Sequence, residues 1–433
     1  MPKRSAPRGD VFWYRSETAP VAPLERDLSV DAVVVGGGMA GLTCARFLSD
    51  GGLSVALLEK RFCGAGASGK SSGFITPASE LELSDLIATF GVDRARELWA
   101  FAEGGLELIR STIREFGIAC DFQVQDSLFV AADEDGARRA ADEHHARTGL
   151  GYPSTHYTKQ DLPAVLGTAA FGGGVRYPGT FGIDSYRYCR GLRAVLERQG
   201  VLVFEGTPVT SVGSGIVHAA GHRVSAQHVV VCADRCIPDL SLLRDQIGQI
   251  QTFLAITKPL RDEQVRAVFP DAPVMVWDSR LAYNYFRLTG EQRLLVGGAD
   301  LWRVYALRER HDPLRNLQAL ADFVAQTFPG LDVSWDHVWP GLLGVSKDLL
   351  PIAGRDADDP GLTCIGAATG LPWAAALGRH FGRLIASGGG GSYPEFSAGR
   401  REVRPTVWNR LLTQRGALAL AHGMRLASNR RRA

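Results

Sequence analysis

The chain has 433 residues, of which 45% are hydrophobic, and a formal net charge of +2; a globular protein of this length has room for a large core and two domains. The charge is uneven, because residues 398–433 carry nine arginines and one acidic residue, a net charge of +8 that leaves −6 for the rest. The body of the chain gives no indication of nucleic-acid binding, no run of about 18 apolar residues predicts a membrane-spanning helix, and the basic start of the chain is not followed by the apolar segment of a signal peptide.

Residues 1–26 are predicted to form an N-terminal arm. They are rich in proline and include Phe12, Trp13 and Tyr14. Large aromatic side chains bury much apolar surface, so we expect these three to hold the arm against the body.

A glycine-rich turn follows the first strong apolar run. Residues 30–35 are apolar, residues 36–41 read Gly-Gly-Gly-Met-Ala-Gly, a helical pattern comes next, and a second apolar run ends at Glu59. A strand, a Gly-x-Gly-x-x-Gly turn, a helix and a closing carboxylate are typical of dinucleotide binding, because the turn and helix N-terminus receive the pyrophosphate and the carboxylate receives a ribose. The alternative is a glycine-rich turn in an unrelated βαβ unit, but the complete context favours the binding motif.

The remaining elements alternate between helical and strand patterns. A polar glycine-rich loop spans residues 64–73, helical patterns span 84–116, 185–199 and 313–327, and strand-like segments lie at 126–131, 174–177, 201–204 and 228–233. Residues 250–300 show β alternation, and a last strand, turn and helix span 363–385. This order predicts a mainly parallel sheet from the two ends of the chain and an antiparallel sheet from its middle.

Four of these segments occur in the same order in one known family. They are the turn at 36–41, the Gly-Ala-Ser-Gly loop at 66–69, the segment at 283–298 and the glycine turn at 366–371. On these motifs the chain resembles the FAD-dependent amine and amino-acid oxidoreductases of the D-amino-acid oxidase, glycine oxidase and sarcosine oxidase superfamily. The arm, with Tyr-Phe-Arg-Leu-Thr at 285–289 and Arg-Leu-Leu-Val-Gly-Gly at 293–298, looks most like the gamma-glutamylputrescine oxidoreductase branch.

The resemblance implies an α/β fold, α+β overall, with a Rossmann-like FAD-binding domain and a discontinuous antiparallel-sheet substrate domain. By position, the FAD-binding domain comprises residues 27–80, 180–245 and 335–392, and the substrate domain comprises 81–179 and 246–334, followed by a basic C-terminal tail at 393–433.

The resemblance also implies which residues contact FAD. The small residues of the loop let backbone N–H groups reach the cofactor, and the helix that starts near Pro372 directs its positive dipole end at the flavin. The predicted FAD contacts are Gly36, Gly38, Met39, Ala40, Gly41, Glu59, Lys60, Gly66, Ala67, Ser68, Gly69, Ser71, Ser72, Gly73, Val209, Ala233, Gly344, Thr369, Gly370, Leu371 and Pro372.

The chain departs from its relatives at three places. Relatives often have histidine where this chain has Thr369, and arginine and asparagine where it has Lys70 and Ser71. Some relatives attach flavin through a cysteine near the position of residues 344–348, but this stretch contains none. We therefore expect non-covalent FAD, and the substrate of a better-known relative does not transfer to this chain.

Five side chains are candidates for the catalytic or substrate site, each with a structural alternative. Trp373, Tyr283 and Tyr285 are expected to line the substrate site or to be ordinary core and strand aromatics. Arg287 would hold a substrate carboxylate or belong to a structural ion pair, and Lys70 would promote oxygen reduction beside the flavin or lie on a surface loop. No His, Cys or acidic spacing predicts a metal site.

These residues predict an enzyme that oxidises a C–N bond of a small amine or amino acid to an imine by hydride transfer to flavin N5. Such a reaction needs orientation and a dry site rather than a protein nucleophile. Oxygen is the expected acceptor, giving hydrogen peroxide. The alternatives are a dehydrogenase that passes electrons to a quinone or carrier protein, and a non-catalytic flavoprotein that serves as a partner in an assembly.

Two further expectations concern location and the tail. The seven scattered cysteines lack the spacing of a zinc or disulfide framework, so we expect reduced thiols and a cytoplasmic protein. The tail carries a short apolar stripe, Trp408, Leu411 and Leu412, with arginines nearby. This pattern predicts an amphipathic helix that contacts a membrane or a protein partner, or a helix docked on its own domain; we favour the second interpretation.

Overall fold

The computed structural model describes residues 7–15, 21–78, 80–213, 215–244, 246–280, 282–298, 309, 312–389 and 393–400. The chain forms two compact units: unit 1 contains Met1–Glu17, Ala67–Tyr188 and Gln251–Leu342, and unit 2 contains Thr18–Gly66, Cys189–Ile250 and Leu343–Ala433. The predicted basic helix in the tail lies outside the described residues. Within the described part of the chain, no helix is both long enough and apolar enough to cross a membrane.

Unit 2 contains the mainly parallel sheet that the sequence predicts. The sheet has the order β10-β11-β12-β1-β2-β9, and β19 pairs with both β12 and β18. β1 pairs in parallel with β2 and β12, whereas β10, β11 and β12 form an antiparallel meander. The strands are β1 (Leu28–Val35), β2 (Val55–Leu58), β9 (Leu202–Phe204), β10 (Val209–Gly213), β11 (Ile216–Ala219), β12 (His222–Val231), β18 (Ile352–Arg355) and β19 (Leu362–Gly366).

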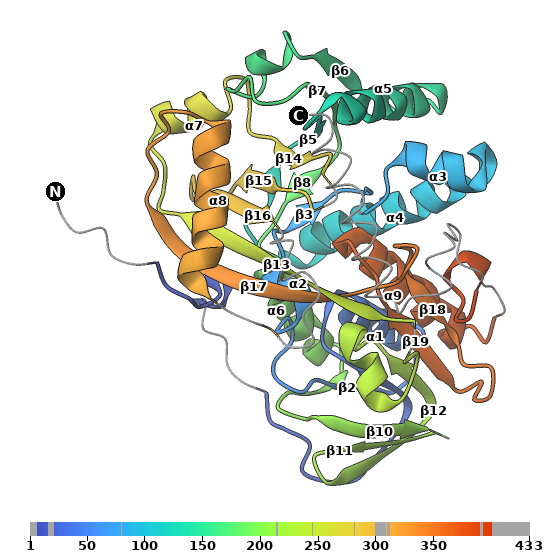
Figure 1. The fold of residues 1–433 in the computed structure, drawn as a ribbon. Coiled ribbons are helices and arrows are strands. Elements are labelled where there is room, and N and C mark those ends of the chain that lie inside the picture. The colour runs from blue at the N-terminus through green and yellow to red at the C-terminus, as the bar shows by residue number, and fades with distance from the viewer. Residues whose placement is uncertain are drawn as a thin grey trace. The chain divides into compact units, whose positions relative to one another are not determined.

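Two helices of unit 2 pack closely together through glycine. A Cβ atom at Gly378 of α9 (Leu371–Ala386) would lie 2.4 Å from the carbonyl oxygen of Ala40 in α1 (Met39–Asp50). A Cβ atom at Gly382, one turn later, would lie 2.8 Å from the Cβ of Phe47. Both helices appear beside the sheet in Figure 1. The remaining helices of this region are α6 (Ser185–Arg198), η3 (Asp234–Leu240) and η4 (Pro394–Phe396).

Unit 1 is built on a largely antiparallel sheet with the order β17-β13-β16-β15-β14-β5-β7-β6. Among the strand pairs whose register the structure describes in this sheet, β14 and β5 are parallel. The other described pairs are antiparallel: β13·β16, β14·β15, β15·β16, β5·β7 and β6·β7. The strands are β5 (Ser127–Val130), β6 (Thr155–Thr158), β7 (Gly173–Tyr177), β13 (Gly248–Thr257), β14 (Met275–Asp278), β15 (Tyr285–Leu288), β16 (Leu294–Gly298) and β17 (Trp335–Val345). A small sheet has the order β3 (Phe74–Ile75), β8 (Phe181–Gly182), β4 (Gln123–Val124).

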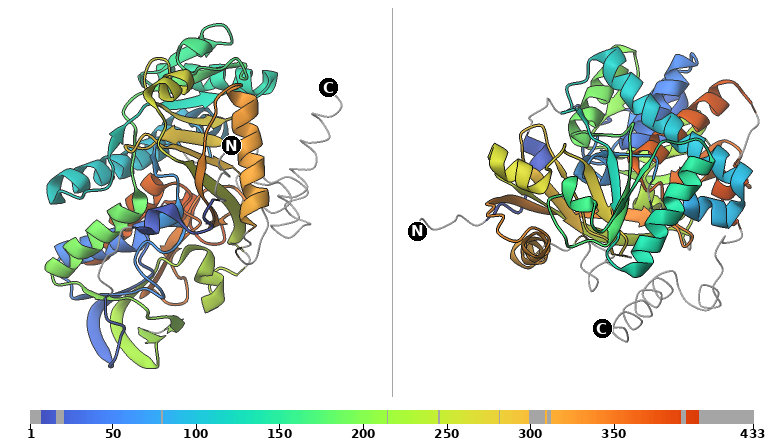
Figure 2. Two further views of the ribbon diagram at one scale, coloured as in Figure 1. Left: turned by 90° about the vertical axis from the view of Figure 1, so that its left-hand side faces the viewer. Right: turned by 90° about the horizontal axis from the view of Figure 1, so that it is seen from above.

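Helices cover this sheet. Leu320 and Val324 of α8 (Pro313–Thr327) share one core cluster with the strand residues Leu294 and Val296, and Figures 1 and 2 show α8 in orange along the sheet. The predicted helical stretch 84–116 is two helices, α3 (Leu83–Phe90) and α4 (Val92–Phe116), because Gly91 between them has φ +78°. The other helices are α2 (Ala67–Lys70), α5 (Glu134–Gly149), α7 (Asp262–Val268), η1 (Phe12–Arg15) and η2 (Leu162–Ala164).

The aromatic residues of the arm are held in unit 1. Phe12 and Trp13 are 3% and 4% exposed. Their rings contact His337 and Trp339 edge-on at centroid distances of 5.3 and 6.1 Å, and the ring of Tyr14 lies 4.9 Å from that of Tyr186.

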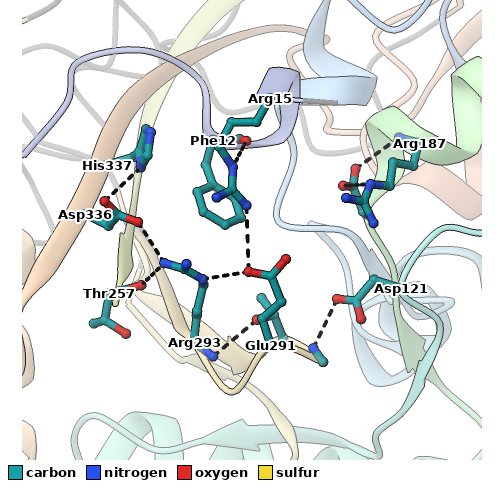
Figure 3. Close-up of polar contacts among 12 residues, drawn as sticks. Phe12, Arg15, Asp121, Arg187, Thr257, Glu291, Arg293, Asp336 and His337 are labelled. Atoms are coloured by element: carbon teal, nitrogen blue, oxygen red, sulfur yellow. Dashed lines mark hydrogen bonds and ion pairs between the residues drawn. The ribbon is translucent and has the colours of Figure 1, made fainter. Parts of the chain in front are cut away.

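An ionic network surrounds the arm (Figure 3). Arg293 donates to Glu291 at 2.8 Å and to Asp336 at 2.7 Å. Glu291 in turn lies 3.8 Å from the guanidinium of Arg15, and the guanidinium of Arg293 lies 4.9 Å from the centre of the Phe12 ring. The arm is therefore fixed by apolar burial and by charge together.

Candidate functional site

The turn between β1 and α1 requires glycine at two of its positions. Gly36 has φ +109°, and a Cβ atom there would lie 2.6 Å from the carbonyl oxygen of Cys232. A Cβ atom at Gly41 would lie 1.9 Å from the carbonyl oxygen of Gly36. Gly38 is different, because its φ of −85° and ψ of −174° are extended values that any residue adopts. The backbone of the turn therefore explains Gly36 and Gly41 but not Gly38.

Two helices of unit 2 are preceded by a glycine, which has no side chain to cap them. Gly38 precedes α1 and Gly370 precedes α9, and neither helix has a side-chain hydrogen bond at its N-cap. Pro372 lies in the first turn of α9, and Met39 and Leu371 are the first residues of the two helices. Unpaired N–H groups and the positive end of a helix dipole attract phosphates and other anionic groups.

Glu59 holds the backbone of the glycine turn. Its Oε2 accepts the N–H of Gly37 at 2.8 Å, and its Oε1 accepts the N–H of Arg61 at 2.9 Å. Burial raises the pKa of Glu59, while these two N–H groups oppose that shift. The neighbouring Lys60 donates from Nζ to the Sγ of Cys236 at 3.1 Å.

Asp234 links two segments that are predicted to face the flavin, and sequence reasoning missed it. Its Oδ2 accepts the N–H of Gly344 at 2.8 Å, and its Oδ1 accepts the N–H of Ala367 at 3.0 Å. A Cβ atom at Gly344 would lie 2.7 Å from Asp234 Oδ1, which explains the glycine. The available signal was an acidic residue one position after Ala233, at the end of the apolar strand β12.

The turn after β19 contains a buried hydroxyl group without a partner. Thr369 Oγ1 is buried and makes no hydrogen bond to any residue that the structure describes, although the Thr369 N–H donates to Ala367 O at 3.0 Å. An orphaned buried hydroxyl group costs free energy unless a ligand satisfies it. Together with the uncapped helix N-termini, this turn fits a cofactor that presents polar atoms.

Trp373 and Val209 have ordinary surroundings in unit 2. Trp373 is 4% exposed and its ring contacts Phe396 edge-on at 5.9 Å. Val209 is half-buried and pairs with Ala219 where β10 meets β11. These contacts support the core interpretation of Trp373.

Four carbonyl groups of the predicted flavin loop are anchored within unit 1. Trp339 Nε1 donates to Lys70 O at 3.0 Å, and Trp13 Nε1 donates to Ser71 O at 2.9 Å. Ser185 Oγ donates to Ser68 O at 2.7 Å, and Arg287 Nε donates to Ser72 O at 2.7 Å. The loop is therefore held by side chains from distant parts of the sequence. The other loop residues predicted to contact FAD are Gly66, Ala67, Gly69 and Gly73, of which Ala67 and Gly69 lie in α2.

Arg287 is fully buried and pairs with backbone. Besides Ser72 O, its guanidinium donates to Ile183 O at 2.7 Å and to Leu288 O at 3.2 Å. Burial lowers the pKa of Arg287 to about 10, and the charges of Asp121 and Asp184 oppose this shift. A Cβ atom at Gly182 would lie 2.8 Å from Arg287 Nη1, so glycine makes room for the guanidinium. These contacts favour the structural interpretation of Arg287 over a substrate contact.

Lys70 is not a surface lysine. It is 8% exposed, and its Nζ donates to Glu309, with Oε2 at 2.8 Å. Its positive charge is therefore already compensated by a carboxylate in unit 1.

Replacing Trp13 with phenylalanine should lower the free energy of unfolding by about 1–3 kcal/mol, because the Ser71 carbonyl group loses its buried donor while the aromatic ring remains. Urea unfolding of the FAD-free protein measures this effect. Trp13→Ala should cost more, about 3–5 kcal/mol, because a large cavity is also formed. If Trp13→Phe is as stable as the wild type, the arm does not hold the loop through this hydrogen bond.

Within the described residues, no group of three or more His, Cys, Asp or Glu side chains is arranged to hold a metal ion.

Comparisons with known proteins agree on one family. A family model described as "FAD dependent oxidoreductase" (DAO) matches residues 31–387. The chain is 28% identical over 352 residues to gamma-glutamylputrescine oxidoreductase of Escherichia coli, covering 78% of this chain and 79% of that protein. It is 26% identical over 366 residues to probable oxidoreductase OrdL of Haemophilus influenzae, covering 80% and 81% of the two chains.

Solved structures share the fold at lower identity. Glycine oxidase from Geobacillus kaustophilus superposes with a TM-score of 0.73 at 18% identity, covering 86% of this chain and 99% of that chain. L-proline dehydrogenase from P. horikoshii superposes with a TM-score of 0.71 at 17% identity, covering 84% and 95%. Both likenesses concern the fold.

Proposed function

Because the chain belongs to the family of FAD-dependent oxidoreductases whose model matches residues 31–387, we propose that it oxidises a C–N bond of a small amine or amino acid to an imine, with oxygen as the acceptor. Gamma-glutamylputrescine oxidoreductase and a glycine oxidase, the curated relatives at 28% and 23% identity, bear names of amine and amino-acid oxidoreductases. The product of oxygen reduction is hydrogen peroxide.

The observation that carries the proposal is the pair of glycine-capped helices in unit 2. Gly38 and Gly370 place no side chain over the N-termini of α1 and α9, and Thr369 adds a buried hydroxyl group that has no partner among the described residues. The residues that would hold FAD are the turn at 36–41, Glu59, the anchored loop at 66–73 and the turn at 366–372. When bound, FAD supplies a two-electron acceptor for hydride from the carbon next to the amine nitrogen.

The protein's own groups then position the substrate and exclude water. Hydride transfer needs an oriented amine and a dry site rather than a protein nucleophile. Aromatic side chains can orient the amine and displace solvent. The aromatic side chains proposed to line the substrate site are Tyr283 and Tyr285, and both are half-buried in unit 1.

One observation favours a second candidate function. Lys70, predicted to promote oxygen reduction through its charge, is ion-paired with Glu309. A compensated lysine attracts superoxide less strongly than a free one. A dehydrogenase that passes electrons to a quinone or carrier protein would need no such charge.

An anaerobic flavin-reduction screen tests the function. Amines, polyamines, N-methyl amino acids and amino acids are mixed with the flavoprotein, and flavin absorbance is followed. We expect at least one class to bleach the flavin, and air to restore the colour within seconds. Bleaching followed by slow reoxidation in air indicates the dehydrogenase, and no bleaching by any amine contradicts amine oxidation.

Acid precipitation should release the flavin into the supernatant. Residues 344–348 contain no cysteine that could attach it. Flavin colour that remains in the pellet would contradict non-covalent binding.

A further inference from the structure

Three aromatic rings of unit 1 form an open cluster beside the predicted substrate strand. Phe74 in β3 and Tyr285 in β15 meet edge-on at 5.8 Å, and Tyr283 lies 5.6 Å from Tyr285. All three residues are half-buried. The faces of such rings attract cations.

No cation of the described chain occupies these rings. Elsewhere in unit 1, the Arg147 guanidinium lies 3.3 Å from the centre of the Tyr177 ring. In the described residues, no arginine or lysine lies over Phe74, Tyr283 or Tyr285 in this way. Among the described residues, the faces of these three rings are therefore not paired with a cation of the chain itself.

A carboxylate that has no counter-ion in the described part of the chain adjoins the cluster. Tyr283 donates its hydroxyl group to Glu80 Oε1 at 3.3 Å. Burial raises the pKa of Glu80, and the Tyr283 hydroxyl group alone opposes this shift. By contrast, Glu143 has Arg147 at 2.7 Å, and Asp126 has Arg176 at 2.8 Å. Among the residues that the structure describes, Glu80 has no such basic partner.

Glu82 provides an independent sign that a ligand completes this region. It is the N-cap of α3 and 6% exposed, and its Oε1 accepts the N–H of Trp277 at 3.0 Å, but its buried Oε2 has no hydrogen-bond partner among the described residues. The Trp277 ring lies 6.4 Å from that of Phe74, and the charge of Glu82 acts on Tyr283. Glu80 thus faces the aromatic cluster without a neutralising cation in the described chain, whereas the charge of Arg147 acts on Glu82 and opposes the rise of its pKa.

We propose that Glu80, with Phe74, Tyr283 and Tyr285, binds a second, non-reacting ammonium group of the substrate, so that the substrate class is diamines and polyamines. This inference rests on the proposed function. The reacting nitrogen must be neutral before hydride leaves the adjacent carbon, whereas a carboxylate with aromatic faces stabilises the protonated form. The cluster therefore suits the other nitrogen, the one that stays charged and fixes the substrate's position.

The test compares 1,4-diaminobutane with n-butylamine, which has the same carbon chain and lacks the second nitrogen. Anaerobic flavin reduction by the holoenzyme should favour the diamine by about 10- to 100-fold at low substrate concentration, the range expected for a charge-assisted contact. Glu80→Gln should remove most of this preference and leave butylamine almost unchanged. Glu97→Gln, an exposed glutamate in α4, should leave both substrates unchanged.

Anaerobic calorimetric titration of 1,4-diaminobutane into the dithionite-reduced holoenzyme, whose flavin cannot accept a hydride, provides a readout without turnover. Glu80→Gln should weaken binding at least about 10-fold, and Tyr283→Phe should weaken it less because the ring remains. If binding depends on Glu80 but no amine bleaches the flavin, the cation site stands and the proposed oxidation fails. If Glu80→Gln leaves diamine binding unchanged, or impairs diamine and monoamine equally in a normally folded protein, the cation site is wrong.

Discussion

Gly38→Val should reduce FAD affinity by at least about 100-fold, which corresponds to about 2.8 kcal/mol, without unfolding unit 2. The backbone at Gly38 has extended φ and ψ angles that any residue adopts, so valine causes no backbone strain. Its side chain would occupy the space in which the cofactor pyrophosphate approaches the start of α1. The measurement is flavin content after purification, followed by titration of FAD into the apoprotein.

The control is Gly354→Val in β18 of the same unit. A Cβ atom at Gly354 has no neighbour within 4 Å, and valine suits a strand, so this variant should bind FAD normally. Gly41→Val is a less informative variant, because the Cβ lies 1.9 Å from a backbone oxygen and unfolding would explain any loss. A folded Gly38→Val protein that binds FAD as tightly as the wild type would refute the assignment of this turn.

Arg287→Met should lower the free energy of unfolding by about 3–5 kcal/mol. Methionine replaces the aliphatic stem of the side chain but leaves the carbonyl groups of Ser72 and Ile183 without their donor, and each such loss costs about 1–3 kcal/mol. The loop at 66–73 should loosen as well, so flavin content should fall. Urea unfolding and flavin absorbance measure the two effects separately.

The competing role of Arg287, pairing with a substrate carboxylate, makes a different prediction. In that case kcat/KM for acidic substrates should fall by about 30- to 1000-fold, corresponding to roughly 2–4 kcal/mol, while neutral amines of similar size change little. Arg287→Lys keeps the charge but not the planar set of donors, so a backbone-holding role predicts only partial rescue of stability. Equal losses for acidic and neutral substrates, with reduced flavin content, indicate the structural role.

Some residues of the candidate site can be assigned from the sequence alone, and others cannot. Gly36 and Gly41 could be predicted because their role is set within a few residues: a tight turn and a close helix start. Alternation predicts a strand through both Tyr283 and Tyr285; Tyr285 begins β15, but Tyr283 lies before the strand. The same alternation places Arg287 on the strand, but it does not reveal whether the guanidinium meets a substrate or a backbone carbonyl group.

The sequence by itself determined the local elements, because hydrophobic period, glycine turns and caps act over short distances along the chain. Helix α8 begins at Pro313 after Asp312, whose side chain accepts the N–H of Arg315, and the predicted span 313–327 matches the structure. Only the tertiary structure decided which distant groups meet. Trp339 donates to Lys70 O across 269 positions, and Tyr283 donates to Glu80 across 203. Such pairs follow from sheet order and burial, which bring together residues that no local pattern connects.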